Sequence, residues 1–245
     1  MPVACNICKT PSTAAFTAEI LGKYQVQYYR CSNCGYLHTE EPYWLNEAYT
    51  DAIADMDTGI IVRNQKFAKV VPLVIDYYFD KRGKFIDFGA GYGIFVRMMR
   101  DRGYNFYWYD EYSTNIFAKK FFAQREKYEL LTSFEVFEHL VDPKNVVGKM
   151  SAYSDSILFS TTLIPSGYNL EDLRKWWYLS PETGQHVSLY TEKSLRILAS
   201  HFGMNFYTNG YNFHLFTKKK INPFLFSILK AFKFIIELLK GRKDD

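Results

Sequence analysis

A glycine-rich turn at residues 85–95 constrains the fold of this chain more than any other stretch. A short apolar run ends at Asp87, and Gly89, Gly91 and Gly93 follow at alternate positions. The residues beyond the turn place apolar side chains at helical spacing, so the order is strand, tight turn, helix. Glycines let the backbone approach a ligand closely, and a helix N-terminus offers unpaired N–H groups. The stretch therefore predicts a binding site for a polar ligand.

The length and composition fit one α/β domain, alone or with a small appendage. The 245 residues are 48% hydrophobic, which is enough for a packed core. The net charge of +4 is mild, and positive residues gather only near the C-terminus, so the charge does not point to nucleic acid. Residues 1–9 contain no apolar run like that of a signal peptide, so a cytoplasmic protein is expected.

All four cysteines lie near the N-terminus, in two Cys-x-x-Cys pairs: Cys5 with Cys8, and Cys31 with Cys34. This spacing is typical of a tetrahedral four-thiolate zinc site, and the residues between the pairs predict a β-hairpin. Two disulfides are the alternative, but they need an oxidising compartment. We therefore expect a zinc ribbon with a structural role for Zn²⁺, because four thiolates leave no position open for a substrate.

A linker with aromatic residues follows at 41–49, and a long helical pattern further on runs to about Phe79. Asp57 or Thr58 is the expected N-cap of this helix, and Pro72 is expected to kink or divide it. In its first turns, Arg63 and Asn64 either face a ligand at the sheet edge or form part of a solvated helix surface.

An acid ends the second predicted strand, at Asp110, about 20 residues beyond the glycine turn, where a carboxylate can accept hydrogen bonds from a ribose. The turn reads Asp-x-Gly-x-Gly-x-Gly rather than Gly-x-Gly-x-x-Gly, which argues against a dehydrogenase. This pattern resembles motif I of the class I S-adenosylmethionine-dependent methyltransferases. The resemblance implies a Rossmann-like sheet of seven strands with a terminal antiparallel hairpin. It also implies a set of cofactor-binding residues: Asp87, Gly89, Ala90, Gly91, Gly93, Asp110, Glu111, Phe134 and Glu135.

The downstream chain extends the resemblance. Residues 134–143 resemble the Glu-Val-x-Glu-His-Leu segment that follows the fourth strand in many of these enzymes. A strand is expected at 156–162, and Asn209-Gly210 predicts the terminal hairpin. Only a short interval separates Asp110 from the strand that begins at Tyr128, which leaves little room for a complete third strand.

The cysteines and the Glu138-His139 pair together resemble the zinc-containing sugar methyltransferases. The resemblance implies that His139 and Glu138 act as acid and base toward the acceptor. The alternative is that this pair only caps a helix and packs against the core. His186, in a segment rich in aromatic residues, is a second candidate for base or substrate ligand. The chain lacks the long C-terminal domain of the C-methyltransferases, which favours O-methylation of a sugar hydroxyl in surface-glycan or nucleotide-sugar biosynthesis.

Residues 219–240 form a basic and broadly apolar helical pattern that suits a membrane surface, such as the inner face of the cell membrane. Docking on the core or on a second copy in a homodimer is the alternative. Two other functions compete with sugar methylation. The first is an rRNA methyltransferase with a zinc ribbon, and the second is a non-catalytic scaffold that binds the cofactor. The expected divisions are a zinc ribbon (1–42), a linker with helices (43–82), a methyltransferase domain (83–218) and a basic amphipathic helix (219–245).

Overall fold

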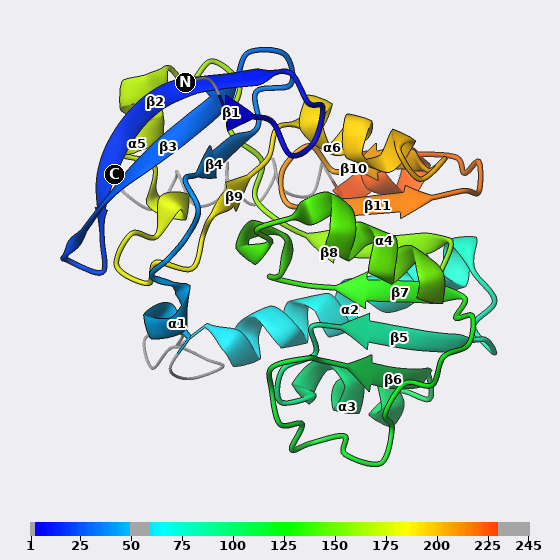
Figure 1. The fold of residues 1–245 in the computed structure, drawn as a ribbon. Coiled ribbons are helices and arrows are strands. Elements are labelled where there is room, and N and C mark those ends of the chain that lie inside the picture. Colours follow the sequence, from blue (N-terminus) through cyan, green and yellow to red (C-terminus); the bar gives the residue numbers. More distant parts are fainter. Residues whose placement is uncertain (1–2, 50–58, 230–245) are drawn as a thin grey trace, which may run out of the picture.

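The computed structural model describes residues 3–49 and 59–229, which form two sheets (Figure 1). The larger sheet has the strand order β10-β11-β8-β7-β5-β6, and the smaller has the order β1-β2-β3-β4-β9. Figure 1 shows the smaller sheet packed beside one end of the larger one, close to α6.

The larger sheet is mixed. β5 to β8 pair in parallel, while β11 pairs antiparallel with both β8 and β10. This arrangement confirms the predicted Rossmann-like methyltransferase sheet with its antiparallel terminal hairpin. The strands are β5 (Lys84–Phe88), β6 (Asn105–Tyr109), β7 (Leu130–Ser133), β8 (Ser156–Ser160), β10 (Asn205–Thr208) and β11 (Phe213–Thr217).

The described part of this sheet has six strands rather than the expected seven. Beside β6, where a further strand would pair, a single parallel bridge joins Trp108 to Phe122. The segment between Asp110 and Tyr128 is mostly irregular, with turns and bends in place of a strand. The short interval in the sequence is the physical reason, because it leaves no length for a strand with its connections.

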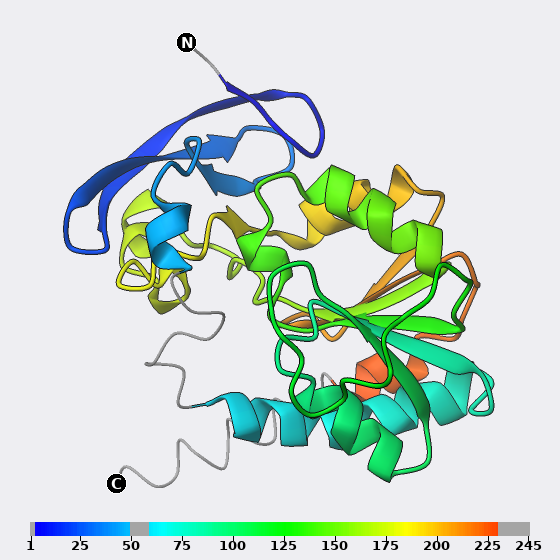
Figure 2. The same cartoon turned by 60° about the horizontal axis from the view of Figure 1, so that its bottom comes forward.

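Helices cover both faces of the larger sheet, as Figure 2 shows. On one face, buried side chains of α4 (Pro143–Tyr153) and α6 (Glu192–Ser200) form one core cluster with the sheet. On the other face, α2 (Ile60–Tyr78) and α3 (Ile94–Asp101) form a second cluster. The short helices are α1 (Leu45–Ala48), α5 (Leu170–Arg174) and the 3₁₀ turns η1 (Phe137–His139) and η2 (Trp177–Leu179).

The helix α2 contains Pro72 within a single helical segment, so Pro72 does not divide this helix. Its N-cap is Gly59, and the predicted caps Asp57 and Thr58 lie outside the described residues. Its C-cap is Phe79, as the pattern predicts.

The smaller sheet combines β1 (Val3–Ala4), β2 (Pro11–Ile20), β3 (Tyr24–Cys31) and β4 (Leu37–Thr39) with β9 (Ser188–Leu189). β2 and β3 form the hairpin that the sequence predicts between the cysteine pairs. β9 pairs antiparallel with β4, so this sheet extends beyond residues 1–42 and includes a strand from the second half of the chain.

Side-chain contacts fix the cysteine loops to α6 and to the residues around β9. The Thr191 hydroxyl donates to the Cys34 carbonyl at 2.5 Å, and the Tyr36 hydroxyl hydrogen-bonds with Ser188. Nε2 of His201 hydrogen-bonds to the Ile7 carbonyl at 2.8 Å. The two sheets therefore share one packed core.

The described beginning of the C-terminal segment packs on the second core cluster. Phe226 is 1% exposed, and its ring lies near Tyr78, Tyr207 and Phe213. Residues 230–240, the second half of the helix expected over 219–240, lie outside the described residues. Among residues 3–49 and 59–229, no helix has the length and apolar character needed to cross a membrane.

Candidate functional site

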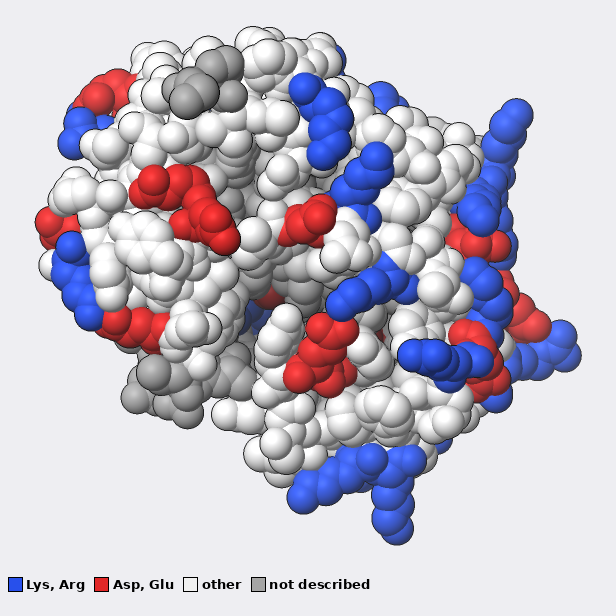
Figure 3. Space-filling model, in the orientation of Figure 1, with Lys and Arg blue, Asp and Glu red and all other residues white. Residues whose placement is uncertain are grey.

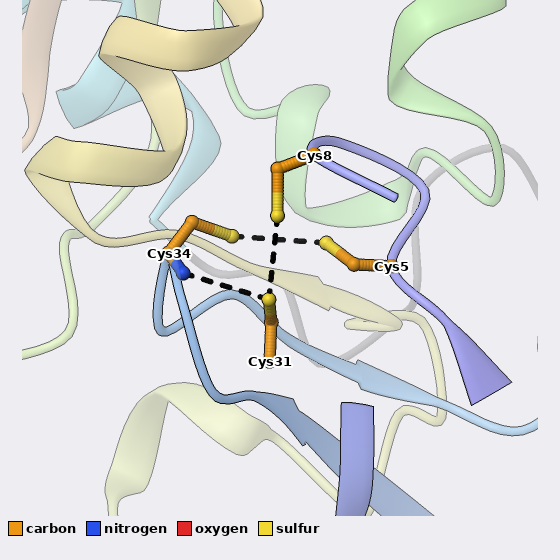
Figure 4. A group of neighbouring side chains, drawn as sticks. All are labelled: Cys5, Cys8, Cys31 and Cys34. Atoms are coloured by element: carbon orange, nitrogen blue, oxygen red, sulfur yellow. Dashed lines mark hydrogen bonds between the residues drawn. The ribbon is translucent and has the colours of Figure 1, made fainter. Parts of the chain in front are cut away.

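Four sulfur atoms gather around one point where the loop after β1 meets the loop after β3 (Figure 4). The Sγ atoms of Cys5 and Cys34 are 3.7 Å apart, and those of Cys8 and Cys31 are 3.4 Å apart. All four cysteines are free thiols rather than disulfides. A tetrahedral ion with Zn–S bonds of about 2.3 Å requires S···S distances of about 3.8 Å, so this arrangement fits a zinc ion.

Both cysteine loops have a conformation that suits metal binding. The Ile7 amide donates to Cys5 Sγ at 3.4 Å, and the Cys34 amide donates to Cys31 Sγ at 3.5 Å. Gly35 has a φ of 70° and lets the chain turn directly after the second pair. Such N–H···S bonds stabilise thiolate charge, which is the form that binds a metal.

The predicted glycine turn connects β5 to α3. Gly89, Gly91 and Gly93 all have positive φ, and Gly93 is the N-cap of α3. A Cβ added to Gly89 would lie 2.6 Å from Cγ2 of Val136, while one added to Gly91 would meet no described residue within 4 Å. The turn thus packs against the segment after β7 and leaves open space beside Gly91 for a ligand.

The Asp110 carboxylate holds the glycine turn in place. Its Oδ2 accepts from the Gly91 amide at 2.8 Å, and its Oδ1 accepts from the amides of Tyr112 and Ser113 at 2.8 and 2.7 Å. These bonds use three of the about four acceptor positions of a carboxylate. Glu111 points elsewhere, since its Oε1 pairs with Lys149 and accepts from Tyr109.

Asp87, at the end of β5, is 5% exposed. The Thr132 hydroxyl donates to its Oδ1 at 2.6 Å. Burial, with a smaller contribution from the negative charge of Asp110, raises the pKa of Asp87 to about 7. A positively charged ligand would restore the ionised form, which fits the cofactor-binding role that the resemblance implies for Asp87.

Asn115 is a site residue that sequence reasoning missed. It is 3% exposed, and its Nδ2 has no hydrogen-bond partner among the described residues. A Cβ on Gly93 would lie 2.3 Å from this Nδ2, so the amide lies directly on the glycine turn. A buried donor without a partner is costly unless a ligand accepts from it. No local pattern in the irregular segment after Asp110 marks this residue.

Phe134 and Glu135, both expected to contact the cofactor, differ in their surroundings. Phe134 stacks on Phe67 with ring centroids 4.0 Å apart and packs in the second core cluster. Glu135 has a φ of 55°, and its Oε1 accepts from the Ser160 hydroxyl at 2.6 Å.

Oε2 of Glu135 lies 3.6 Å from Nε of Arg63. Arg63 of α2 thus reaches the end of β7, whereas Asn64 donates back to Ile60 within the helix.

The predicted acid–base residues come together although they are far apart in sequence. Glu138 and His139 lie on η1, and His186 lies just before β9. Each offers one donor atom, and the three atoms lie within 4.8 Å of one another. The rings of the two histidines are perpendicular, with centroids 5.1 Å apart. We call Glu138, His139 and His186 the triad.

Backbone carbonyls orient both histidines of the triad. Nδ1 of His139 donates to the Gln185 carbonyl at 3.0 Å, and Nδ1 of His186 donates to the Tyr178 carbonyl at 2.6 Å. In the neutral rings this leaves Nε2 as the acceptor. Loss of hydration, together with the nearby His186, lowers the pKa of His139 to about 3, so its ring is neutral at pH 7. The ring is therefore a weaker base than a histidine with the ordinary pKa of 6.5.

The third member of the triad is a buried carboxylate. Glu138 is 1% exposed, and its Oε2 has no hydrogen-bond partner within the described ranges. The Val187 amide donates to the Glu138 carbonyl at 2.9 Å, which joins η1 to the chain next to His186. Only one residue, Phe137, separates Glu138 from the Val136 side chain that packs beside Gly89.

Aromatic rings surround the triad. The Tyr178 ring lies 4.7 Å from that of His186, and the Tyr49 ring lies 6.1 Å from that of His139. Trp177, next to Tyr178, is 68% exposed. Such rings suit a ligand whose C–H faces stack while its polar groups form hydrogen bonds.

Comparison with known families identifies the class of this protein. Residues 62–208 match the family model described as a methyltransferase domain, and this match covers more than half of the chain. The protein belongs to this family and is a class I S-adenosylmethionine-dependent methyltransferase. No curated protein matches the chain.

Solved structures of methyltransferases have a similar but distant fold. The magnesium protoporphyrin IX methyltransferase of Synechocystis, with bound SAH, is 16% identical, with a TM-score of 0.44 over 70% of this chain and 90% of that one. An O-methyltransferase family protein from Burkholderia thailandensis is 10% identical, with a TM-score of 0.43 over 73% and 68%. An O-methyltransferase family 2 protein from Planctomyces limnophilus, in complex with apigenin, is 12% identical, with a TM-score of 0.42 over 71% and 65%.

A substitution at Gly89 tests the geometry of the turn. Gly89→Ala is expected to weaken S-adenosylhomocysteine binding by at least about tenfold, because the new Cβ would overlap Val136 and the backbone has a φ of 75°. Gly103→Ala is the matched control, since its φ of 87° is also positive, its added Cβ would meet nothing within 4 Å among the described residues, and it lies beyond the opposite end of α3 from the turn. Isothermal titration calorimetry measures both. Equal losses in the two variants would contradict the contact with Val136.

The raised pKa of Asp87 predicts pH-dependent cofactor binding. Its folded pKa of about 7 lies above the ordinary 3.8, so the neutral form prevails below pH 7 and the ionised form above it. The affinity for the cationic cofactor is therefore expected to rise with pH up to about 7 and then to level off, with a limiting slope of about tenfold per pH unit. Asp87→Asn should bind more weakly at pH 8 and lose the dependence. A wild-type profile that is flat from pH 5.5 to 8 would contradict this role.

Proposed function

We propose that this protein transfers the methyl group of S-adenosylmethionine to a hydroxyl of a small polar acceptor, a sugar in surface-glycan or nucleotide-sugar biosynthesis. The observation that carries the proposal is the triad. Among the described residues, it places a buried carboxylate oxygen without a partner beside two imidazoles whose Nε2 atoms form no hydrogen bond there and can accept. It also follows directly on the segment that packs against the glycine turn.

The triad supplies what methyl transfer to oxygen requires. A hydroxyl is a poor nucleophile until a base removes its proton. Nε2 of His139 would accept that proton as the hydroxyl oxygen bonds to carbon, and would later release it to water. The bound cofactor would supply the methyl group from its sulfonium, whose carbon–sulfur bond breaks as the carbon–oxygen bond forms. Glu138 stabilises the charge on the imidazolium, and His186 holds the acceptor.

The cofactor is proposed to lie between the glycine turn and the strand ends. Gly89, Ala90, Gly91 and Gly93 would pack against its methionine part, and Asp87 would face its positive charge. Asn115 would donate to it through Nδ2. Asp110 would accept from the ribose with its remaining lone pair, since three backbone amides occupy the others.

The four cysteines are proposed to bind one structural Zn²⁺. The free thiols and their S···S distances support this assignment. Four thiolates complete a tetrahedron, so the ion would stabilise the N-terminal sheet and take no part in chemistry.

The aromatic side chains around the triad support a sugar acceptor. Tyr49 is 40% exposed beside His139, and Trp177 is 68% exposed next to the buried Tyr178, so two accessible apolar ring faces lie near polar groups. The charged side chains on one face of the described residues do not favour the rRNA alternative. On the face in Figure 3, Lys and Arg side chains are scattered among acidic ones and form no continuous basic stripe.

A product screen tests the proposal. The full chain is incubated with isotopically labelled S-adenosylmethionine and panels of nucleotide-sugars, glycan fragments and rRNA fragments, and the products are analysed by mass spectrometry. A labelled O-methyl sugar is the expected result. Label found only in RNA would show that the acceptor is RNA rather than a sugar. Absence of label from every panel would contradict a sugar as the acceptor.

A further inference from the structure

The triad also has the composition of a metal site. We propose that Glu138, His139 and His186 bind a divalent transition-metal ion and leave its other coordination positions open to oxygen atoms of the methyl acceptor. The identity of the acceptor rests on the proposed function, whereas binding of the ion does not. This ion would be separate from the zinc of the four cysteines.

The two histidines are already oriented as ligands. Each donates Nδ1–H to a backbone carbonyl, at 3.0 Å for His139 and 2.6 Å for His186. Metal-binding histidines commonly use one ring nitrogen for such a bond, which fixes the tautomer and turns the other nitrogen toward the ion. The Nε2 atoms are therefore available without rearrangement of the backbone.

The buried carboxylate gives independent evidence for a cation. Glu138 is 1% exposed, and its Oε2 lacks a partner among the described residues. A buried carboxylate oxygen without a partner is unfavourable, and a bound cation would satisfy it. The donor atoms lie within 4.8 Å of one another, so side-chain rotations can bring them to the spacing of about 3.3 Å required by bonds of about 2.0–2.1 Å.

The donor set indicates the class of metal. Two imidazoles and one carboxylate suit Zn²⁺, Fe²⁺, Co²⁺ or Mn²⁺, while Mg²⁺ and Ca²⁺ prefer oxygen ligands alone. Three protein ligands leave positions for other oxygens, as in catalytic rather than structural sites. A coordinated hydroxyl loses its proton more readily, so in the loaded protein the ion would replace His139 in activating the acceptor.

Cobalt titration of the full chain distinguishes the two metal sites. Protein that retains its cysteine-bound zinc is freed of weakly held metal by brief chelation and then titrated with Co²⁺, with bound metal counted after dialysis. One additional Co²⁺ per chain is expected, with visible absorption bands but without the near-ultraviolet band of a cobalt–thiolate bond. Mg²⁺ added in excess should not displace it.

Variants of the triad assign the ligands. Glu138→Gln and His186→Ala are each expected to weaken Co²⁺ binding at least about tenfold. Gln185→Ala is the matched control, because its side chain donates to the Ala48 carbonyl and its own backbone carbonyl still orients His139. Failure to bind a further ion, or equal affinity in all three variants, would overturn the proposal. Cobalt binding without sugar methylation would contradict the proposed acceptor instead, and sugar methylation without metal binding would leave the proposed function intact.

Discussion

Replacing His139 with alanine is expected to lower kcat by about 10²- to 10⁴-fold on the true acceptor, which is the usual contribution of a general base. The affinity for S-adenosylhomocysteine should not change, because His139 contacts Gln185 and the other members of the triad rather than the glycine turn. Steady-state kinetics and calorimetry measure the two quantities separately. The double variant His139→Ala, His186→Ala should be inactive.

The control for this result is a histidine outside the triad. His201, whose Nε2 hydrogen-bonds to the Ile7 carbonyl, can be changed to glutamine with little expected effect on kcat. Full activity of the double variant would remove both histidines from the mechanism. A loss of activity that is matched by a loss of folded protein, seen by circular dichroism, would indicate a packing role for His139.

Replacing Cys31 with serine is expected to abolish zinc binding and to lower the free energy of unfolding by about 5 kcal/mol, a loss typical of a removed metal site. For a chain of this size that corresponds to a melting temperature about 10–20 °C lower. The effect should be large because the cysteine cluster packs into the same core as α4 and α6. Metal analysis and calorimetry in reducing buffer measure both changes.

Ser32→Ala is the matched control, because Ser32 lies between the same two cysteines and its exposed hydroxyl donates only weakly to Pro11, at 3.3 Å. It should retain one zinc per chain and a melting temperature close to that of the wild type. Retention of zinc in the Cys31 variant would show that the three remaining thiolates are enough to bind the ion. Absence of zinc from the wild-type protein would contradict a metal role for the cysteines altogether.

Features that depend on neighbours in sequence could be predicted from the chain alone. The glycine turn, the β2–β3 hairpin and the terminal hairpin depend on local conformational preferences, and the structure has all three. Pro72 shows the limit of such rules, since packing of α2 on the sheet keeps a single helix despite the local cost.

Features that depend on contacts across the chain could not be predicted in this way. The two-residue strand β9 exists only because β4 lies beside it. The sequence singled out His139 and His186 separately, but their proximity follows from the bond between Val187 and Glu138. Asn115 has no local signal at all, because its importance comes from burial against Gly93.

The pairing of β4 with β9 has a consequence for how the protein matures on the ribosome. Residues 3–39 emerge early, but their sheet lacks its last strand until residue 189 has been synthesised. Metal capture by the cysteines can begin at once, whereas tight docking must wait for most of the polypeptide. The N-terminal sheet is therefore expected to stay open to proteolysis during synthesis and to close late, and His186, two residues before β9, would reach its final position in that same step.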